Sequence, residues 1–298
     1  MWAAMSILLS LTLQTAPRRP KYEFARCGTI DRSLAVLLSS VVLVVVLTAI
    51  LFWKPSQQAG EPLVVYAAAS LRQPLDAIAR SYEKETGTQV QVQYGGSQTL
   101  LANIKLSKTG DVYVPADESY IELARRDDLV EQTVPLARMH PVLVVEKGNP
   151  HKISSLDDLL TRELKISQGD PDAGAIGKVT HDVLTKLGKW ESLRAKTTVF
   201  KTTVNDVGND LKVGAADAGI IWDSLMPQYP TVEVVPTPEF EGATARILAA
   251  VLSTGKQRPA AVKFAEYLGA ADKGLIALKK AGFEVESSEP AASAGANP

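Results

Sequence analysis

The chain has few of the residues that build covalent or metal-held scaffolds. Its single cysteine, Cys27, excludes an intrachain disulfide framework. Its three histidines, His140, His151 and His181, lie far apart without metal-ligand spacing, so we expect no bound metal cation and no cofactor. The formal net charge is only -1, whereas a nucleic-acid partner needs a clustered excess of lysine and arginine. A small anion is still a possible ligand, because helix N-termini supply donors without net charge.

Two loops carry only part of a catalytic signature. Residues 94–99, YGGSQT, lack the second glycine of a nucleophile elbow. Gly169 and Gly174 have the spacing of a phosphate loop, but Ala175 stands where a lysine is needed. Asp170 and Asp172, in the segment DPDAG, could pair for acid–base chemistry or bind calcium, although such a segment is more typical of a turn. We therefore expect no enzyme, and a membrane-tethered hydrolase or phosphate-handling enzyme of α/β fold is the alternative.

The uncharged apolar run from Ser33 to Trp53 is typical of a transmembrane helix. At about 1.5 Å per residue such a helix reaches the roughly 30 Å of a bilayer core. Basic residues dominate the preceding segment: Arg18, Arg19, Lys21, Arg26 and Arg32. The positive-inside rule then predicts a cytoplasmic segment at 1–32 and a single-pass membrane anchor at 33–53, with all later residues on the periplasmic, extracytoplasmic side. A cleaved signal peptide is the alternative.

The remaining chain divides by composition into a linker, a body and a tail. Residues 54–61 form a short polar linker, and residues 287–298 have the small, polar bias of a disordered tail. In the body, β-rich runs alternate with helical spacing; LVVYAA at 63–68, for example, precedes apolar residues spaced as on a helix up to Gly87. Such alternation predicts α/β lobes with largely parallel sheets.

Two serines stand where a predicted strand gives way to a predicted helix. Ser70 follows the strand at 63–68, and Ser97 follows the strand at 90–94. Each could present a hydroxyl and backbone N–H groups at the positive end of a helix, and two such ends facing one crevice would form a neutral cradle for an oxyanion. Plain helix N-capping is the other interpretation, and spacing does not separate the two.

Several segments of the body share a colinear pattern. In order they are VVYAAASLRQPLDAIARSYEKETG, YGGSQTLLANI, GDVYVPADESYIELARRDDLV, GDPDAGAIGKVTHDVLTKLGKWESL, NDVGNDLKVGAADAGIIW and AVKFAEYLGAADKGLIALKKAGF. This series resembles the molybdate-binding proteins of ABC transporters over residues 62–284. The resemblance implies a two-lobed periplasmic-binding-protein-like fold of type II, with lobe one at 62–141 and 240–286, lobe two at 142–239, and the ligand between them.

The resemblance also implies a set of ligand-binding residues. Ser70 and Ser97 would give hydroxyl and backbone N–H donors, while Ile176 and Val207 would give backbone N–H donors. Trp222 falls where the family usually has a tyrosine that reaches the ligand. No catalytic residue is implied, and spacing alone would make Ile176 and Val207 core aliphatic residues. The expected partners are a molybdate or tungstate ion and the permease subunits of an ABC transporter, with the protein a monomer.

Three positions depart from the family pattern and leave the anion open. Trp222 donates through an indole N–H on a longer arm than a tyrosine hydroxyl, and Gly96 stands where a serine is frequent. Residues 172–176 lack the Val-Pro-Ala-Gly sequence typical of that loop. Sulfate or another oxyanion is therefore a further expectation. A neutral site of hydrogen-bond donors accepts fully deprotonated dianions and rejects anions that must donate a proton. A buried acceptor near the site would reverse this preference. Asp206 is the candidate acceptor, although its more ordinary role is to cap a helix.

Overall fold

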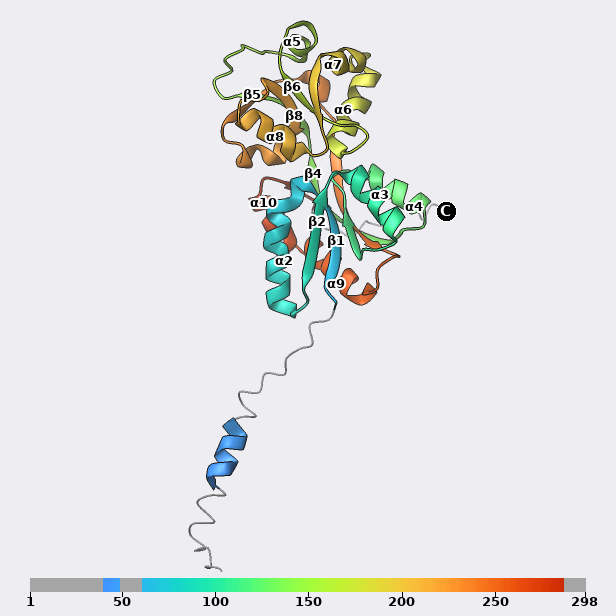
Figure 1. Ribbon diagram of the computed structural model, residues 1–298, viewed down its shortest axis with the longest axis vertical. Helices are drawn as coiled ribbons and strands as arrows, with labels where there is room; N and C mark the ends of the chain where they lie inside the picture. The colour runs from blue at the N-terminus through green and yellow to red at the C-terminus, as the bar shows by residue number, and fades with distance from the viewer. Residues whose placement is uncertain (1–39, 49–60, 287–298) are drawn as a thin grey trace, which may run out of the picture. The chain divides into compact units, whose positions relative to one another are not determined.

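The computed structural model describes residues 40–48 and 61–286, and the chain divides into two compact units after Ser56 (Figure 1). Residues 40–48 are helical, and their side chains are exposed. Within the described residues, no helix combines the length and apolar character needed to span a membrane. The predicted anchor at 33–53 is described only over these nine positions, 40–48. The predicted segments 1–32 and 287–298, and the linker up to residue 60, lie outside the described residues.

The larger unit contains two β-sheets. The first sheet has the order β11-β4-β10-β3-β1-β2. Its strands are β1 (Leu63–Ala68), β2 (Val90–Gly95), β3 (Val112–Val114), β4 (Val130–Met139), β10 (Ala245–Leu252) and β11 (Glu284–Val285). Its helices are α2 (Arg72–Thr86), α3 (Ser97–Ser107), α4 (Ser119–Arg126), α9 (Arg258–Gly269) and α10 (Gly274–Lys280), with the 3-10 turn η1 (Ala69–Leu71) after β1. We call this part the first lobe.

The second lobe is built on a sheet of order β7-β6-β8-β5-β9. Its strands are β5 (Pro141–Glu146), β6 (Ile166–Gly169), β7 (Thr197–Lys201), β8 (Ala218–Trp222) and β9 (Val232–Val235). Its helices are α5 (Leu156–Thr161), α6 (Ala175–Lys186), α7 (Trp190–Lys196) and α8 (Val204–Lys212), with the 3-10 turns η2 (Asp223–Gln228) and η3 (Pro238–Phe240). The two-lobed α/β architecture is the one expected from the sequence (Figure 1).

The expectation of largely parallel sheets is wrong, because both sheets are mixed. β1 pairs in parallel with β2 and β3, and β6 with β7 and β8, as helical crossovers require. In contrast, β10 pairs antiparallel with β3 and β4, and β5 antiparallel with β8 and β9. The chain leaves the first lobe along β4, which His140 alone separates from β5, and it returns along β10. Because β4 leads out of the first lobe and β10 leads back into it, these neighbouring strands run in opposite directions and pair antiparallel.

The first βα unit shows how the sequence places the pocket residues. β1 is apolar and is almost wholly buried, as in a strand covered on both faces. The predicted helix that follows is confirmed: α2 buries Leu75, Ile78 and Tyr82 on one face, and Gly87, with a φ of 74°, ends it in the left-handed conformation that glycine adopts easily. Strand and helix therefore meet at η1, and Ser70 lies in that turn at the carboxyl end of the sheet.

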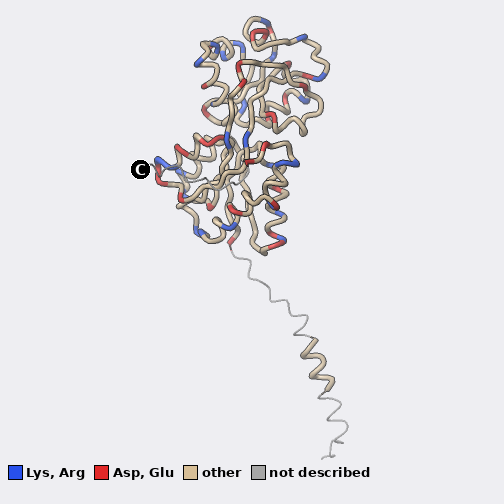
Figure 2. The backbone as a smooth tube through the Cα atoms, turned by 180° about the vertical axis from the view of Figure 1, so that it is seen from behind, with Lys and Arg blue, Asp and Glu red and all other residues tan. Residues whose placement is uncertain are grey.

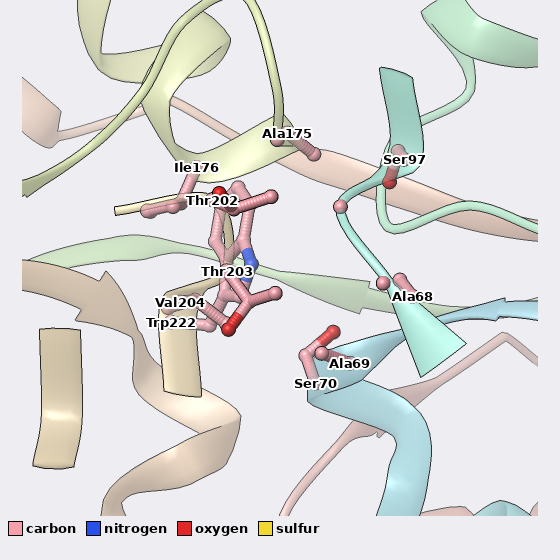
Figure 3. A pocket seen from close by; sticks show the side chains of 13 residues that line it. Ala68, Ala69, Ser70, Ser97, Ala175, Ile176, Thr202, Thr203, Val204 and Trp222 are labelled. Carbon is pink, nitrogen blue, oxygen red and sulfur yellow. The ribbon is translucent and has the colours of Figure 1, made fainter. Parts of the chain in front are cut away.

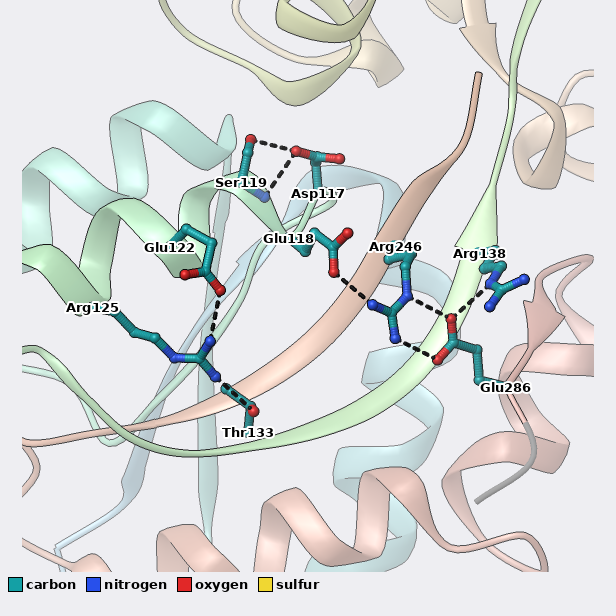
Figure 4. Close-up of polar contacts among 9 residues, drawn as sticks. All are labelled: Asp117, Glu118, Ser119, Glu122, Arg125, Thr133, Arg138, Arg246 and Glu286. Carbon is teal, nitrogen blue, oxygen red and sulfur yellow. Dashed lines mark hydrogen bonds and ion pairs between the residues drawn. The ribbon is translucent and has the colours of Figure 1, made fainter. Parts of the chain in front are cut away.

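Charged residues of both signs are interspersed over the two lobes (Figure 2). One network ties the two crossing strands to the segment after β11 (Figure 4). Arg246 of β10 donates hydrogen bonds to both carboxylate oxygens of Glu286, at 2.9 and 3.1 Å, and to Glu118 at 2.8 Å. Arg138 of β4 donates to the same Glu286 at 2.7 Å. The Arg246 guanidinium, followed by that of Arg138, holds the pKa of the Glu286 carboxyl below its ordinary value.

Candidate functional site

A small cavity of about 20 Å³ lies between the lobes, at the carboxyl ends of β1 and β2 (Figure 3). The first lobe lines it with Ser70 and Ser97, and the second lobe with Ile176, Val204 and Trp222, among others. A cavity needs about 10–15 Å³ to hold one water molecule, so this one suits a compact ligand of a few atoms. Four of the five predicted site residues therefore line one cavity.

Ser70 has a hydroxyl that its own lobe does not use. The residue is 1% exposed, and within the described residues its Oγ has no hydrogen-bond partner. The N-cap of α2 is Leu71, so Ser70 does not cap that helix. A buried hydroxyl without a partner costs about 1–3 kcal/mol. The capping interpretation thus fails for Ser70, and the geometry leaves its hydroxyl as a donor at the cavity.

Ser97 is the first residue of α3 and is fixed by its own lobe. Its Oγ accepts a hydrogen bond from the Ala116 N–H at 3.1 Å, and its carbonyl accepts one from the Tyr113 hydroxyl at 2.7 Å. Burial raises the pKa of Tyr113 well above its usual value, so the phenol keeps the proton that it donates. Gly96, not Ser97, is the N-cap of α3. The Ser97 hydroxyl proton and backbone N–H are therefore available on the cavity side.

The second lobe contributes backbone groups at the start of α6. Gly174 is the N-cap of this helix, and Ala175 and Ile176 are its first two residues. The first N–H groups of a helix have no carbonyl one turn earlier to bond, and they carry the positive end of the helix dipole. The side chain of Ile176 is buried in the lobe. Ile176 lines the cavity at the start of α6, and the donor role of its N–H stays a prediction.

Val207 is not a residue of this cavity, and its prediction needs correction. Helix α8 begins at Val204, because Thr203 caps it: the Thr203 Oγ1 donates to the Asp206 carboxylate at 2.6 Å and accepts from the Asp206 N–H at 3.3 Å. This cap places the start of α8 one turn before Val207. Val207 is fully buried against Gly219 of β8. Val204 is the residue that lines the cavity instead.

Asp206 serves the cap of α8 and does not line the cavity.

Trp222 ends β8 and is 1% exposed. Figure 3 shows its indole nitrogen on the side of the ring that faces Ser70 and Ser97. An indole N–H is a donor only.

The cavity is electrostatically neutral in its side chains. None of the residues that line it is an aspartate, glutamate, lysine, arginine or histidine. Across residues 40–48 and 61–286 there is also no group of three His, Cys, Asp or Glu side chains that could hold a metal ion. What the cavity offers is hydroxyls and N–H groups at the N-termini of α3, α6 and α8, which together favour an anion. The lining side chains provide no general base, because none of them ionises in the ordinary pH range.

Comparison of the sequence with known proteins identifies its family. Residues 63–284 match the model of the family described as bacterial extracellular solute-binding protein. The chain belongs to this family. The molybdate-binding protein ModA of Mycobacterium tuberculosis is 28% identical over 229 residues, which cover 76% of this chain and 85% of that protein. The molybdate-binding protein ModA of Escherichia coli is 27% identical over 237 residues, covering 75% and 89%.

A solved structure supports the fold of this family member. The periplasmic molybdate-binding protein of Azotobacter vinelandii superposes with a TM-score of 0.59 at 22% identity, covering 74% of this chain and 98% of that protein. At this identity the match shows the fold. The predicted two-lobed periplasmic-binding-protein fold and the predicted family are thus both confirmed.

Proposed function

We propose that this protein is the extracytoplasmic solute-binding component of an ABC transporter and that it captures molybdate or a related tetrahedral oxyanion between its lobes. The observation that carries the proposal is the cavity itself: two buried serines from one lobe face helix N-termini of the other, with no charged side chain in the lining. The relatives named as molybdate-binding proteins support the same ligand class.

The donor set follows from this geometry. Ser70 and Ser97 donate their hydroxyls, Ile176 and Val204 their backbone N–H groups, and Trp222 its indole N–H. Val204 takes the role that the sequence assigned to Val207. A tetrahedral dianion presents four oxygens that only accept hydrogen bonds, which matches a lining rich in donors.

The same donor set discriminates between anions. Phosphate keeps one proton near neutral pH and needs an acceptor for it, whereas molybdate, tungstate and sulfate are fully deprotonated. Asp206, the acceptor considered from the sequence, is engaged by Thr203 outside the lining. We therefore expect molybdate, tungstate or sulfate to bind and phosphate to be rejected.

The proposal includes a closing motion and a partner. Residues 62–141 and 240–286 would move as one lobe and residues 142–239 as the other, by hinge rotation about the two crossings of the chain. The closed monomer would then be the form recognised by permease subunits. No covalent step is proposed.

The proposal also places the protein at the membrane. The uncharged run 33–53, preceded by basic residues, would form a single-pass anchor and hold the solute-binding unit on the periplasmic side. Membership in the family of bacterial extracellular solute-binding proteins supports this placement outside the cytoplasm.

Thermal unfolding of the full chain with molybdate, tungstate, sulfate or phosphate tests the function. A ligand at about 100 times its dissociation constant stabilises the folded state by roughly 2.7 kcal/mol. The expected result is a higher melting temperature with at least one dianion and an unchanged melting temperature with phosphate. No shift with any oxyanion would overturn the proposal, and turnover of a phosphate or carboxylic ester would favour an enzyme instead.

A further inference from the structure

Gly96 occupies a position where the backbone itself does not require glycine. It is the N-cap of α3, with φ of -69° and ψ of 141°. This is the extended region that every residue type adopts without strain. Serine, threonine, aspartate and asparagine are the preferred residues at such a cap. The reason for glycine at this position must therefore lie in the surrounding space.

That space is filled by the backbone of the opposite lobe. A methyl group placed on Gly96 would lie 2.4 Å from the carbonyl oxygen of Ala173 and 2.6 Å from that of Thr202. Both oxygens belong to the second lobe, whereas Gly96 belongs to the first. Carbon and oxygen atoms at these distances overlap strongly, and backbone atoms cannot rotate away as a side chain can. Only a residue without a Cβ lets the two lobes approach this closely.

Two hydrogen bonds join the lobes at the same point. The backbone N–H groups of Gln98 and Thr99 donate to the Ala173 carbonyl oxygen, at 3.1 and 3.3 Å. They are among the N-terminal donors of α3 that have no partner inside the helix. These bonds need no ligand. Because Ser97 lies between Gly96 and Gln98, the contact also fixes the distance from the Ser97 donors to the second lobe.

We propose that Gly96 is a positioning residue that sets how far the lobes close, and thereby the size of oxyanion that the cavity accepts. We call Gly96, the N–H groups of Gln98 and Thr99, and the carbonyls of Ala173 and Thr202 the backbone latch. The inference rests on the proposed oxyanion-binding function. A side chain at position 96 would hold the lobes apart, so the donors of both lobes could not reach one small anion together.

The latch predicts a specific change in affinity. If only the closed form binds tightly, the apparent dissociation constant rises in proportion to the loss of the closed population. Gly96→Ala and Gly96→Ser should therefore weaken molybdate binding at least tenfold. The larger opening should also narrow the difference in affinity between molybdate and the smaller sulfate. Serine is a strong N-cap, so Gly96→Ser should leave the ligand-free melting temperature unchanged or higher.

The experiment combines calorimetric titration with a distance measurement on the full chain. Spin labels at Leu106→Cys on the first lobe and Val213→Cys on the second, residues 87% and 75% exposed, report the separation of the lobes in a Cys27→Ser background. The control is Ala102→Ser, at an exposed position further along α3 that does not line the cavity. The control should change neither lobe separation nor affinity by more than threefold.

Each outcome decides one of the two proposals. Longer lobe separation and weaker binding in both position-96 variants, but not in the control, support the backbone latch. Unchanged separation and affinity in Gly96→Ala and Gly96→Ser overturn it. If the unsubstituted chain binds no oxyanion, the proposed function fails, and the separation measured without ligand still decides whether a Cβ at position 96 opens the lobes.

Discussion

The two lobes contribute different kinds of donor to one cavity. The first lobe presents the hydroxyls of Ser70 and Ser97, which lie in the turn after β1 and the first turn of α3. The second lobe presents the N-terminal backbone of α6 and α8, near Ile176 and Val204, together with the indole of Trp222. A hydroxyl donor disappears when its side chain is replaced, whereas a backbone donor survives almost any substitution. Substitution of Ser70, Ser97 or Trp222 should therefore weaken binding, whereas substitution of a residue that offers only its backbone N–H, such as Ile176, should change stability and leave affinity almost unchanged.

The largest effect is expected from Ser70→Ala combined with Ser97→Ala. A hydrogen bond to a charged group contributes roughly 1.5–3 kcal/mol, so losing two should weaken oxyanion binding about 100-fold or more. Isothermal titration calorimetry measures this, with Ser107→Ala at the exposed far end of α3 as the matched control. Affinity within threefold of the unsubstituted chain would remove the serines from the site.

The two serines should differ in the ligand-free protein. Ser70→Ala removes a buried hydroxyl that has no partner among the described residues, so the melting temperature should stay equal or rise. Ser97→Ala leaves the Ala116 N–H without its acceptor and should cost about 1 kcal/mol. A large loss of stability in Ser70→Ala would restore the view that this serine has a capping role.

Trp222 should have a smaller effect on affinity than the serine pair. Trp222→Phe removes the indole N–H, and Trp222→Tyr returns a donor on a shorter arm. Loss of one hydrogen bond to an anion should weaken binding about tenfold in the phenylalanine variant. Comparison of the two variants by titration controls for lost ring volume, since they differ by one hydroxyl. Equal affinity of both variants and the unsubstituted chain would mean that the indole nitrogen does not contact the anion.

Substitution of Ile176 should change stability and leave affinity almost unchanged. Ile176→Val keeps the N–H of α6 and removes one buried methylene, which costs about 0.5–1.5 kcal/mol of unfolding free energy. The affinity for molybdate should stay within threefold. Denaturant unfolding and titration of the same sample measure the two quantities. A tenfold loss of affinity without loss of stability would show that the side chain contacts the ligand.

The smallest effect concerns the charged network on the crossing strands, which contrasts with the neutral cavity. Arg246 lowers the pKa of Glu286, so this carboxylate stabilises the folded state above its unfolded pKa of about 4.3, and the stabilisation is lost as pH falls through the lower folded value. Glu286→Gln should lower the unfolding free energy by about 1 kcal/mol at pH 7. The difference in unfolding free energy between the variant and the unsubstituted chain should shrink below pH 4. A difference that stays constant with pH would contradict the stabilising role of the Glu286 carboxylate.

Local patterns in the sequence were enough to single out Ser70 and Ser97 as candidate site residues of the first lobe. Ser70 and Ser97 were placed at strand–helix junctions, and both line the cavity. The resemblance assigned the donor in α8 to Val207, whereas the Thr203–Asp206 cap starts this helix at Val204. Backbone donors leave no mark in residue type, so Val204 could be found only from the helix start.

Long-range pairing explains what local patterns missed. Strand β4 has Pro135 near its centre, a residue that sequence patterns treat as a strand breaker. In the structure the register of β10 shifts between Ile247 and Leu248, whose partners are Ala137 and Pro135, so the proline sits beside a bulge. Gly96 and the loop at 172–176 both depart from the family pattern at separate places in the sequence, and the structure places them in contact between the lobes. No local pattern reveals such a contact.

Calorimetric titration of the full chain with molybdate, tungstate, sulfate and phosphate tests the central claim most directly. A neutral cavity of hydroxyl and N–H donors predicts binding of at least one of the three deprotonated dianions, with an affinity nearly constant from pH 6 to pH 9. It predicts no measurable binding of phosphate at neutral pH, where that anion keeps a proton. Preference for phosphate over all three dianions, or no binding of any of the four, would contradict the account.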